Sequence, residues 1–338
     1  MRTTLRDIAR ESGLDISTVS RSLSGAYGIN KDTRARVEQA ALRLHYVPNG
    51  LARGLATGIS KTIALIVNDI RNPFYAEIAR GVEDTAFAAG FDLMLGNSDL
   101  KWERQMRYVH AMASKQIDGI ILNPAGAIGV KEREDLLRYR LPVVVLSSPE
   151  RKGIFHSVLV DNRAGGRLAG EHLKALGHRR AVVLAAASKQ KNLMDRVKGF
   201  SEAFGAEVQV YRGEHSHRGA CDLMTGVLSE RRDFSAVFAV NDAMAIGALE
   251  AMKAAGISVP DEISLVGFDD VAVAALLDPP LTTVAQPKYD IGVAAAEMLM
   301  RKIPGSGVAY DAAIEQRQLN VELKVRRSTK EFSDPQSR

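Results

Sequence analysis

The chain has a single cysteine, Cys221, among its 338 residues. An intrachain disulfide is therefore impossible, and neither a cysteine-based zinc finger nor an iron–sulfur cluster can be built from this sequence. A lone cysteine usually behaves as a small, partly buried apolar residue, and we interpret Cys221 in this way.

Long apolar runs are also missing. The longest runs, such as residues 63–67 and 143–146, have the length of a β-strand and fall far short of the ~20 residues that cross a bilayer. The opening residues, Met1-Arg2-Thr3-Thr4, do not begin an apolar signal-peptide core. We therefore expect a cytoplasmic protein.

The common catalytic motifs are absent as well. The sequence has no Gly-x-Gly-x-x-Gly after an expected strand, no Gly-x-x-x-x-Gly-Lys-Ser/Thr loop, no Gly-x-Ser-x-Gly and no His-Glu-x-x-His. His215 and His217 could ligate a metal, but two histidines in a polar loop are more often solvated. An enzyme stays open as an alternative only because doubly wound folds often carry catalysis. We expect no enzymatic activity, no metal and no cofactor.

The charge that is present is unevenly spread. With 46% hydrophobic and 25% charged residues, the composition is that of a globular protein with two or three folding units. Residues 1–60 hold nine Lys/Arg against five Asp/Glu, a net charge of +4, whereas the other 278 residues hold 36 against 35. A basic end suggests a polyanion partner, because each neutralised phosphate releases counterions. A small helical domain could also carry this charge for solubility alone.

Three short helices are predicted in residues 1–48. The first begins at Thr4 and ends at Gly13, the second is capped by Asp15, and the third is capped by Asn30 and covers about residues 31–44. A tight turn between the first two helices is typical of the helix-turn-helix module, whose second helix enters the major groove.

On the second helix, Val19 and Leu23 lie four residues apart and face the core, which leaves Ile16, Ser17 and Arg21 facing outward. Three-helix domains with apolar stripes are common, so periodicity alone leaves DNA binding as one of two interpretations.

Five strings add to the periodicity: Thr4-Leu5-Arg6-Asp7-Ile8-Ala9, Gly13-Leu14, Thr18-Val19-Ser20-Arg21, Thr33-Arg34 and Tyr46-Val47-Pro48-Asn49. In order and spacing they closely resemble the DNA-binding headpiece of the lactose-repressor (LacI/GalR) family of bacterial transcription regulators. The resemblance implies that Ile16, Ser17 and Arg21 read bases, with Arg21 placed for bidentate contact with a guanine. It also implies phosphate contacts by Thr18, Ser20, Ser24, Asn30 and Thr33.

Residues 49–60 resemble the hinge helix and linker of that family, through the string Asn49-Gly50-Leu51-Ala52-Arg53-Gly54-Leu55-Ala56. The resemblance implies that Asn49, Ala52 and Leu55 contact DNA, with Leu55 wedged between base pairs from the minor groove; an ordinary linker leucine is the alternative. About eight residues are fewer than the ~12 to 15 at which isolated helices become marginally stable, and Gly54 costs about 1 kcal/mol relative to alanine. We expect this hinge to fold only on DNA beside a dimer mate, so that an effector can control its order.

Residues 61–330 alternate apolar, strand-length runs with helical stretches. The runs form two sets of four: 63–67, 91–95, 119–122 and 143–146, then 182–185, 208–211, 236–240 and 263–266. Continuous apolar runs indicate strands covered on both faces, and intervening helices indicate right-handed parallel crossovers, so we predict two doubly wound α/β lobes. This agrees with the type I periplasmic-binding-protein-like effector and dimerisation domain of the family, in which the chain would cross between lobes near residues 161, 289 and 320. Residues 331–338 are predicted to be a flexible tail.

Ligands of open parallel sheets bind beyond the carboxyl ends of the strands, where this chain has polar residues; such loops are common in any α/β protein. Six strings in this region resemble landmarks of the family: Asn72-Pro73-Phe74-Tyr75, Asp161-Asn162, 195–200, 241–247, 266–269 and 281–284. The resemblance thus covers nearly the whole chain. It implies effector contacts by Phe74, Tyr75, Asn123, Arg196, Asn241 and Asp269 and, by a looser match, by Gln190, His215 and Gln286.

These side chains suit a sugar or similar polyol, because Asp accepts hydroxyl protons, Arg and Asn donate, and an aromatic face packs on C–H groups. Two departures favour an anion such as a sugar acid or sugar phosphate. Ser147 stands where many sugar-binding relatives carry an aspartate, and Lys189 and Lys191 add positive charge near Arg196. Both lysines could equally be solvated loop residues.

Together these features predict a nucleoid-associated repressor that binds a pseudo-palindromic operator as a homodimer and responds to a small effector between the lobes. The sequence leaves open whether the effector is an inducer or a corepressor. Residues 326–338 lack the leucine heptads that would join dimers into a tetramer. A free-standing sugar receptor is the remaining alternative, but it would need an export signal and does not explain residues 1–60.

Overall fold

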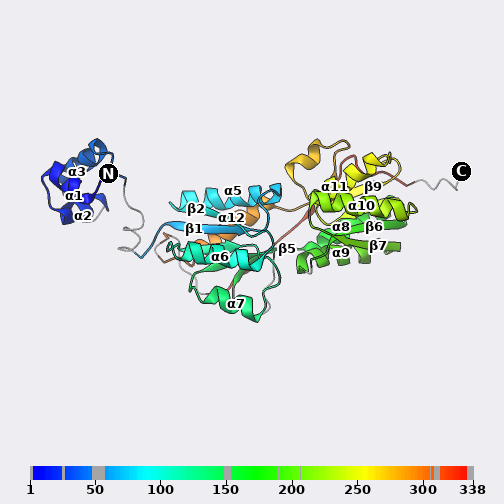
Figure 1. Cartoon of the computed structure of the whole chain (residues 1–338), viewed down its shortest axis with the longest axis horizontal. Helices are drawn as coiled ribbons and strands as arrows, with labels where there is room; N and C mark the ends of the chain where they lie inside the picture. The colour runs from blue at the N-terminus through cyan, green and yellow to red at the C-terminus, as the bar shows by residue number, and fades with distance from the viewer. Residues whose placement is uncertain are drawn as a thin grey trace. The chain divides into compact units, whose positions relative to one another are not determined.

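A computed structural model of the chain describes residues 3–24, 27–47, 58–147, 154–188, 190–205, 207–304, 306–307 and 313–332. The chain divides into two compact units, residues 1–60 and residues 61–338 (Figure 1). Each unit has its own hydrophobic core.

The described residues of the first unit form three helices, α1 (Leu5–Ser12), α2 (Ile16–Leu23) and α3 (Lys31–Arg43). Helix α1 starts where the backbone N–H of Thr4 donates to the Asp7 carboxylate, and it stops at Gly13, whose φ of 65° a glycine adopts without strain. The core consists of four fully buried side chains, Ile8, Val19, Val37 and Ala40. These are the three helices that the apolar spacing predicts.

The second unit consists of two lobes, each built on a six-stranded sheet. In the first lobe the strand order is β11-β5-β4-β3-β1-β2, and all neighbouring strands are parallel. Helices α5 and α12 pack together on one face of this sheet, and α6 and α7 lie on the other (Figure 1). The elements are β1 (Thr62–Val67), α5 (Pro73–Ala88), β2 (Asp92–Asn97), α6 (Trp102–Ala113), β3 (Gly119–Leu122), α7 (Val130–Leu137), β4 (Val143–Leu146), β5 (His156–Val160), α12 (Lys288–Met300) and β11 (Gln316–Leu319).

In the second lobe the strand order is β12-β10-β9-β8-β6-β7, and only β12 is antiparallel to its neighbour. Helices α8 and α9 pack as one pair and α10 and α11 as another. The elements are α8 (Asn162–Ala175), β6 (Arg180–Ala186), α9 (Lys191–Phe204), β7 (Glu207–Gly213), α10 (His217–Glu230), β8 (Ala236–Ala239), α11 (Asp242–Ala254), β9 (Ser264–Asp269), η1 (Ala272–Leu276), β10 (Thr282–Ala285) and β12 (Glu322–Lys324).

The chain passes between the lobes three times: between β5 and α8, between β10 and α12, and between β11 and β12. The two doubly wound lobes are therefore as predicted, and every residue of the central strands β3, β4 and β8 is buried. Each sheet, however, has two strands more than the four that the apolar runs predict. Strands β11 and β12 escaped prediction because their residues alternate in exposure and include several charged side chains.

The predicted tail requires a correction at its start. Phe332 donates its backbone N–H to the carbonyl of Leu176 at 2.7 Å, and its ring lies against the buried ring of His178, with 5.6 Å between the centroids. Phe332 thus contacts the second lobe through its backbone N–H and one face of its ring, although the residue stays 37% exposed. Within the described ranges, no helix combines the length and the apolar character that a membrane span requires.

Candidate functional site

Helix α2 presents the three side chains that are predicted to read bases. Ile16 is 45% exposed, Ser17 and Arg21 are exposed too, and Val19 on the opposite face is buried. Arg21 donates from Nη2 to the backbone carbonyl of Tyr27 at 3.1 Å, a bond that solvent can reach. The N-terminal turn of this helix can therefore meet base edges without unpacking the core.

The predicted phosphate contacts lie on two helices. Thr18, Ser20 and Ser24 lie on α2 or at its end, whereas Asn30 and Thr33 form the start of α3. The Asn30 side chain accepts the backbone N–H of Thr33 at 2.7 Å and so caps α3. A helix N-terminus attracts phosphate. The three remaining DNA contacts implied by the resemblance, Asn49, Ala52 and Leu55, lie outside the described residues, as does the predicted hinge helix.

A cavity of about 730 Å³ opens between the two lobes of residues 61–338. It lies at the carboxyl ends of the strands, where the sheet topology predicts a ligand. Eight of the nine predicted effector residues line it: Phe74, Tyr75, Asn123, Gln190, Arg196, His215, Asn241 and Asp269.

The wall from the first lobe is built at the start of α5. Asn72 caps this helix by accepting the backbone N–H of Phe74 at 3.0 Å, and Pro73 occupies the first turn. The rings of Phe74 and Tyr75 meet edge to face, with 5.1 Å between the centroids. The Tyr75 hydroxyl accepts a hydrogen bond from Asn123 Nδ2 at 2.7 Å, and burial raises the pKa of that hydroxyl, so it stays neutral. This wall offers aromatic faces beside a hydroxyl and an amide.

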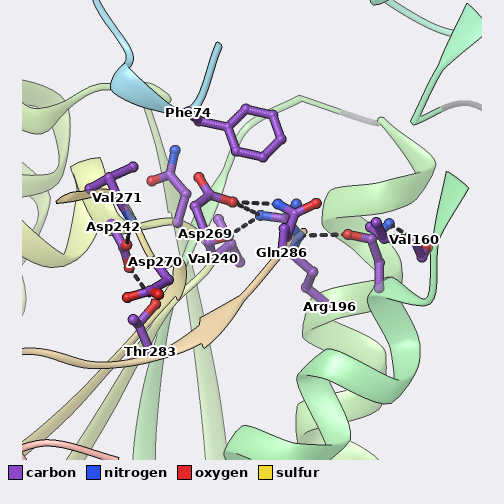
Figure 2. A network of polar contacts seen from close by, with 12 residues as sticks. Phe74, Val160, Arg196, Val240, Asp242, Asp269, Asp270, Val271, Thr283 and Gln286 are labelled. Carbon is purple, nitrogen blue, oxygen red and sulfur yellow. Dashed lines mark hydrogen bonds and ion pairs between the residues drawn. The ribbon is translucent and has the colours of Figure 1, made fainter. Parts of the chain in front are cut away.

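The wall from the second lobe is centred on a buried ion pair. Arg196, on α9, donates from Nη1 to Asp269 Oδ1 at 3.2 Å and to the carbonyl of Val240 at 2.7 Å (Figure 2). Its Nε donates to Asn162 Oδ1 at 2.8 Å, and the guanidinium lies 3.7 Å from the centroid of the Phe268 ring. The Nη2 group makes no hydrogen bond with the described residues, so it can donate to a ligand.

Burial and pairing act in opposite directions on these two charges. Burial lowers the pKa of Arg196 and raises the pKa of Asp269, whereas each charge favours the ionised form of the other. A buried ion pair contributes little net stability, because the cost of desolvation offsets the attraction. The pair is therefore weak evidence for a role in stability.

The histidine in the cavity is held as a neutral ring. Asn241 caps α11 through Oδ1, which accepts the backbone N–H of Met244, and donates from Nδ2 to His215 Nε2 at 2.8 Å. His215 must therefore carry its proton on Nδ1. Burial, followed by the charge of Arg196, lowers the pKa of His215 to about 4, so the ring is an uncharged donor at neutral pH.

Gln190 and Gln286 hold positions that the sequence did not specify. Gln190 donates from Nε2 across the cavity to the carbonyl of Pro124, at 3.2 Å, and so joins the lobes. Gln286 does not line the cavity; it lies behind Asp269 and donates from Nε2 to Asp269 Oδ1 at 2.6 Å. Its predicted direct contact with the effector is corrected to an indirect one, because the Asp269 carboxylate stands between them.

Asp242 is a buried carboxyl that the sequence analysis did not select. Its two oxygens accept the Thr283 hydroxyl at 2.6 Å and the backbone N–H of Val271 at 2.9 Å (Figure 2). Burial, followed by the charge of Asp269, raises the pKa of Asp242 to about 8. Asp242 thereby fixes the loop that follows Asp269. The sequence did contain one indication of this residue, because Asp242 follows the helix cap Asn241 shortly after an apolar strand.

The charges around the cavity do not favour an anion. The described residues that line it include five acids, Asp69, Asp99, Glu214, Asp222 and Asp269, against three arginines, Arg71, Arg196 and Arg218. Lys191, which had suggested an anionic ligand, forms an ion pair with Asp195 and lines a neighbouring cavity of about 280 Å³. Lys189 lies outside the described residues. Ser147 does line the main cavity, as a neutral side chain.

Comparison with known proteins covers both units. The family described as bacterial regulatory proteins, lacI family, matches residues 4–49, and the periplasmic binding protein-like domain matches residues 171–329. The chain is 33% identical over 337 residues to catabolite control protein A of Priestia megaterium. This alignment covers 98% of this chain and all of that protein. It is 32% identical over 310 residues to the ribose operon repressor of Escherichia coli K12, covering 89% of this chain and 93% of the relative.

Solved structures agree over nearly the full length. The lac repressor dimer bound to operator and the anti-inducer ONPF superposes with a TM-score of 0.85 at 25% identity, covering 98% of this chain and all of that one. The complex of the transcriptional regulator CelR with cellobiose gives a TM-score of 0.70 at 30% identity over 97% of this chain and all of that one. These matches confirm the resemblance and the fold class predicted from the sequence. The chain belongs to the lacI family of bacterial regulatory proteins, and it is a transcription regulator that binds DNA through its helix-turn-helix unit rather than an enzyme.

Proposed function

We propose that this protein represses transcription as a homodimer on a pseudo-palindromic operator and is controlled by a neutral sugar or polyol bound between its lobes. The main support for this class of ligand is the buried Arg196–Asp269 ion pair in the cavity wall. Arg196 Nη2 is free to donate and Asp269 Oδ2 is free to accept, since neither makes a hydrogen bond with the described residues. Two neighbouring hydroxyl groups satisfy both atoms.

The opposite wall supports the same ligand. Phe74 and Tyr75 present aromatic surface that packs on the C–H groups of a sugar ring, and Asn123 adds an amide on the same wall. His215 adds a polar atom from the second lobe. Among similar proteins, the ribose operon repressors and the CelR–cellobiose complex carry sugars in their names. We extend that chemistry to this chain.

A neutral ligand fits better than a sugar acid or a sugar phosphate. The anionic group of such a ligand would meet a lining in which five acids outnumber three arginines, so it would be repelled. The lysine that had favoured an anion is neutralised by Asp195 at the edge of another cavity. A sugar hydroxyl avoids both difficulties, since it carries no charge.

For DNA, we propose that Ile16, Ser17 and Arg21 read base edges in the major groove. Thr18, Ser20, Ser24, Asn30 and Thr33 would bind phosphates, and Asn49, Ala52 and Leu55 would enter the minor groove. The exposed face of α2 and the charge of +4 on residues 1–60 support the first two roles. We place the regulator in the cytoplasm, on the nucleoid.

Thermal unfolding in the presence of sugars, sugar acids and sugar phosphates tests the ligand class. A ligand at 100 times its Kd stabilises the folded state by ~2.7 kcal/mol, so binding raises the Tm measurably. We expect neutral sugars to raise it. A Tm raised only by sugar acids or phosphates contradicts the neutral ligand, and operator affinity with and without the bound sugar tells whether the sugar releases or recruits DNA.

A further inference from the structure

The segment that joins β10 to α12, residues 286–288, holds Asp269 from two directions. Gln286 Nε2 donates to Asp269 Oδ1 at 2.6 Å. Lys288 Nζ donates to the backbone carbonyls of Asp269 and Asp270, at 2.9 and 2.7 Å. Lys288 is the first residue of α12, a helix of the first lobe, whereas Asp269 ends β9 in the second lobe. A side chain of the first lobe is therefore hydrogen-bonded to the backbone of Asp269, whose carboxylate is proposed to bind the ligand.

The backbone of Asp269 and Asp270, to which Lys288 is hydrogen-bonded, is strained. Asp269 has a φ of 117° and Asp270 a φ of 55°, both in the region that favours glycine. The strained pair is held by Lys288 and by an ion pair between Arg326 and Asp270 at 2.6 Å. Strain of this kind persists only while the surrounding contacts impose it, so losing the Lys288 contact should let the loop relax.

Gln286 also has an unsatisfied atom. Its side chain is 3% exposed, and its Oε1 has no hydrogen-bond partner in the described structure. The amide cannot simply be turned over, because the Asp269 carboxylate accepts from Nε2. Among the described residues, the hydrogen bond to Asp269 is therefore the only one that the Gln286 side chain makes. Weakening that one hydrogen bond would release the amide.

Movement at residue 288 would be transmitted through the first lobe. Helices α12 and α5 are in very close contact at two glycines: a Cβ on Gly81 would lie 2.2 Å from the Tyr289 carbonyl, and one on Gly292 would lie 2.2 Å from that of Ile78. The Tyr289 hydroxyl also donates to Asp84 on α5. The two helices must move together, and α5 carries the aromatic wall of the cavity.

We propose that residues 286–288 couple occupancy of the cavity to the angle between the lobes. The proposal rests on the proposed function, in which a ligand hydroxyl donates to Asp269. A hydroxyl that donates to Oδ2 withdraws negative charge from the carboxylate, which weakens the hydrogen bond that Gln286 donates to Oδ1. The Gln286 amide is then released from Asp269, and α12 moves with α5 relative to the second lobe. Gln286 and Lys288 are positioning residues that act through Asp269.

The test measures the interlobe distance without any ligand. In full-length protein carrying Cys221→Ser, spin labels are attached at Lys115→Cys in the first lobe and Glu230→Cys in the second, both exposed positions. Labelled chain is diluted with excess unlabelled chain so that pulsed electron resonance records distances within one chain. Gln286→Met and Lys288→Met should each shift or broaden the distance distribution.

Gln318→Met is the matched control. Gln318 precedes another lobe crossing, is exposed and makes no hydrogen bond through its side chain in the described structure, so its replacement should leave the distances unchanged. The melting temperature of each variant establishes that it is folded. If either folded variant keeps the wild-type distances, residues 286–288 do not set the lobe angle and the proposal is wrong.

A second arm separates this proposal from the proposed function. D-Ribose and cellobiose are added as probes, and both Tm and interlobe distance are recorded. We expect the sugar that raises Tm to shift the distances of the wild type and to shift those of Lys288→Met by less than half as much. An equal shift in both overturns the coupling while leaving sugar binding intact. If neither probe raises Tm, only the sugar class is in question, because the ligand-free distances still decide the coupling.

Discussion

Asp269 Oδ1 accepts two hydrogen bonds, from Arg196 Nη1 on α9 at 3.2 Å and from Gln286 Nε2, between β10 and α12, at 2.6 Å. The carboxylate is 4% exposed, so these bonds are shielded from solvent. One oxygen is thus used to hold the protein together and the other remains for a ligand. Recognition and conformational control meet at the same carboxyl group.

Replacing Asp269 by asparagine should weaken sugar binding by about 10- to 100-fold, because a hydrogen bond to a charged group contributes about 1.5–3 kcal/mol. Calorimetric titration with the sugar that raises Tm measures the loss. The matched control is Asp222→Asn, an exposed acid on the margin of the same cavity, which should change affinity little. Equal losses in the two variants would show that net charge, rather than the Asp269 contact, determines affinity.

Arg21→Ala should relax base preference, whereas Thr33→Ala should weaken binding to all sequences alike. A base contact contributes about 1–3 kcal/mol of discrimination, and a phosphate contact contributes none. Binding to a set of operator variants separates the two effects. Arg43→Ala on α3 removes the same charge as Arg21→Ala from a surface ion pair and should leave the ranking of sequences intact. Equal loss of specificity in Arg21→Ala and Thr33→Ala would refute the assigned roles.

Gly54→Ala should tighten operator binding about five-fold per chain, because alanine favours a helix over glycine by about 1 kcal/mol. The prediction depends on the hinge folding only on DNA, and titration with operator DNA measures it. Backbone chemical shifts of the free protein give an independent check. Helical shifts at residues 50–56 without DNA contradict the account.

Asp242 should make stability fall as the pH rises. Its pKa is raised by burial to about 8, from 3.8, so the folded state holds a proton that the unfolded state releases between those values. His215 acts in the opposite direction, since its pKa is lowered to about 4, but its effect ends near pH 6.5. From pH 6.5 to about 8 the wild type should therefore lose stability relative to Asp242→Asn, with no further relative loss above that.

Urea unfolding of both proteins at several pH values measures this difference. His178→Gln is a suitable control, because the pKa of His178 is also lowered to about 4 and its effect is complete before the window begins. A constant difference between wild type and Asp242→Asn from pH 6.5 to 8 contradicts a protonated Asp242.

The assembly should be a homodimer, because a pseudo-palindromic operator presents two half-sites related by two-fold symmetry. Light scattering at several concentrations gives the mass. A tetrameric mass contradicts this prediction.

The sequence predicts the central strands and the headpiece well because both follow from apolar spacing. Val19 and Ile8 are buried where a period of 3.6 places them, and β3 and β4 are the continuous apolar runs of a sheet covered on both faces. Strands β11 and β12 carry no such run. They become strands only because a neighbouring strand offers its edge, which is information that local sequence does not contain.

The site shows the same division. Family strings place Arg196 and Asp269 in the cavity, but the depth of Gln286 behind Asp269 depends on a lobe crossing that no local pattern describes. The hydrogen bond from Lys288 to the carbonyl of Asp269 likewise depends on the tertiary structure. Lys191 is different, because its spacing of four from Asp195 on one helix already predicts the ion pair that removes it from consideration.

Operator affinity with and without the bound sugar, in the wild type and in Asp269→Asn, tests the central claim most directly. A ligand with a ~100-fold preference for one lobe arrangement supplies about 2.7 kcal/mol of coupling per site. We predict that saturating sugar changes operator affinity by up to about that factor per bound sugar in the wild type and has little effect on the variant. An equal change in both proteins would contradict control through Asp269.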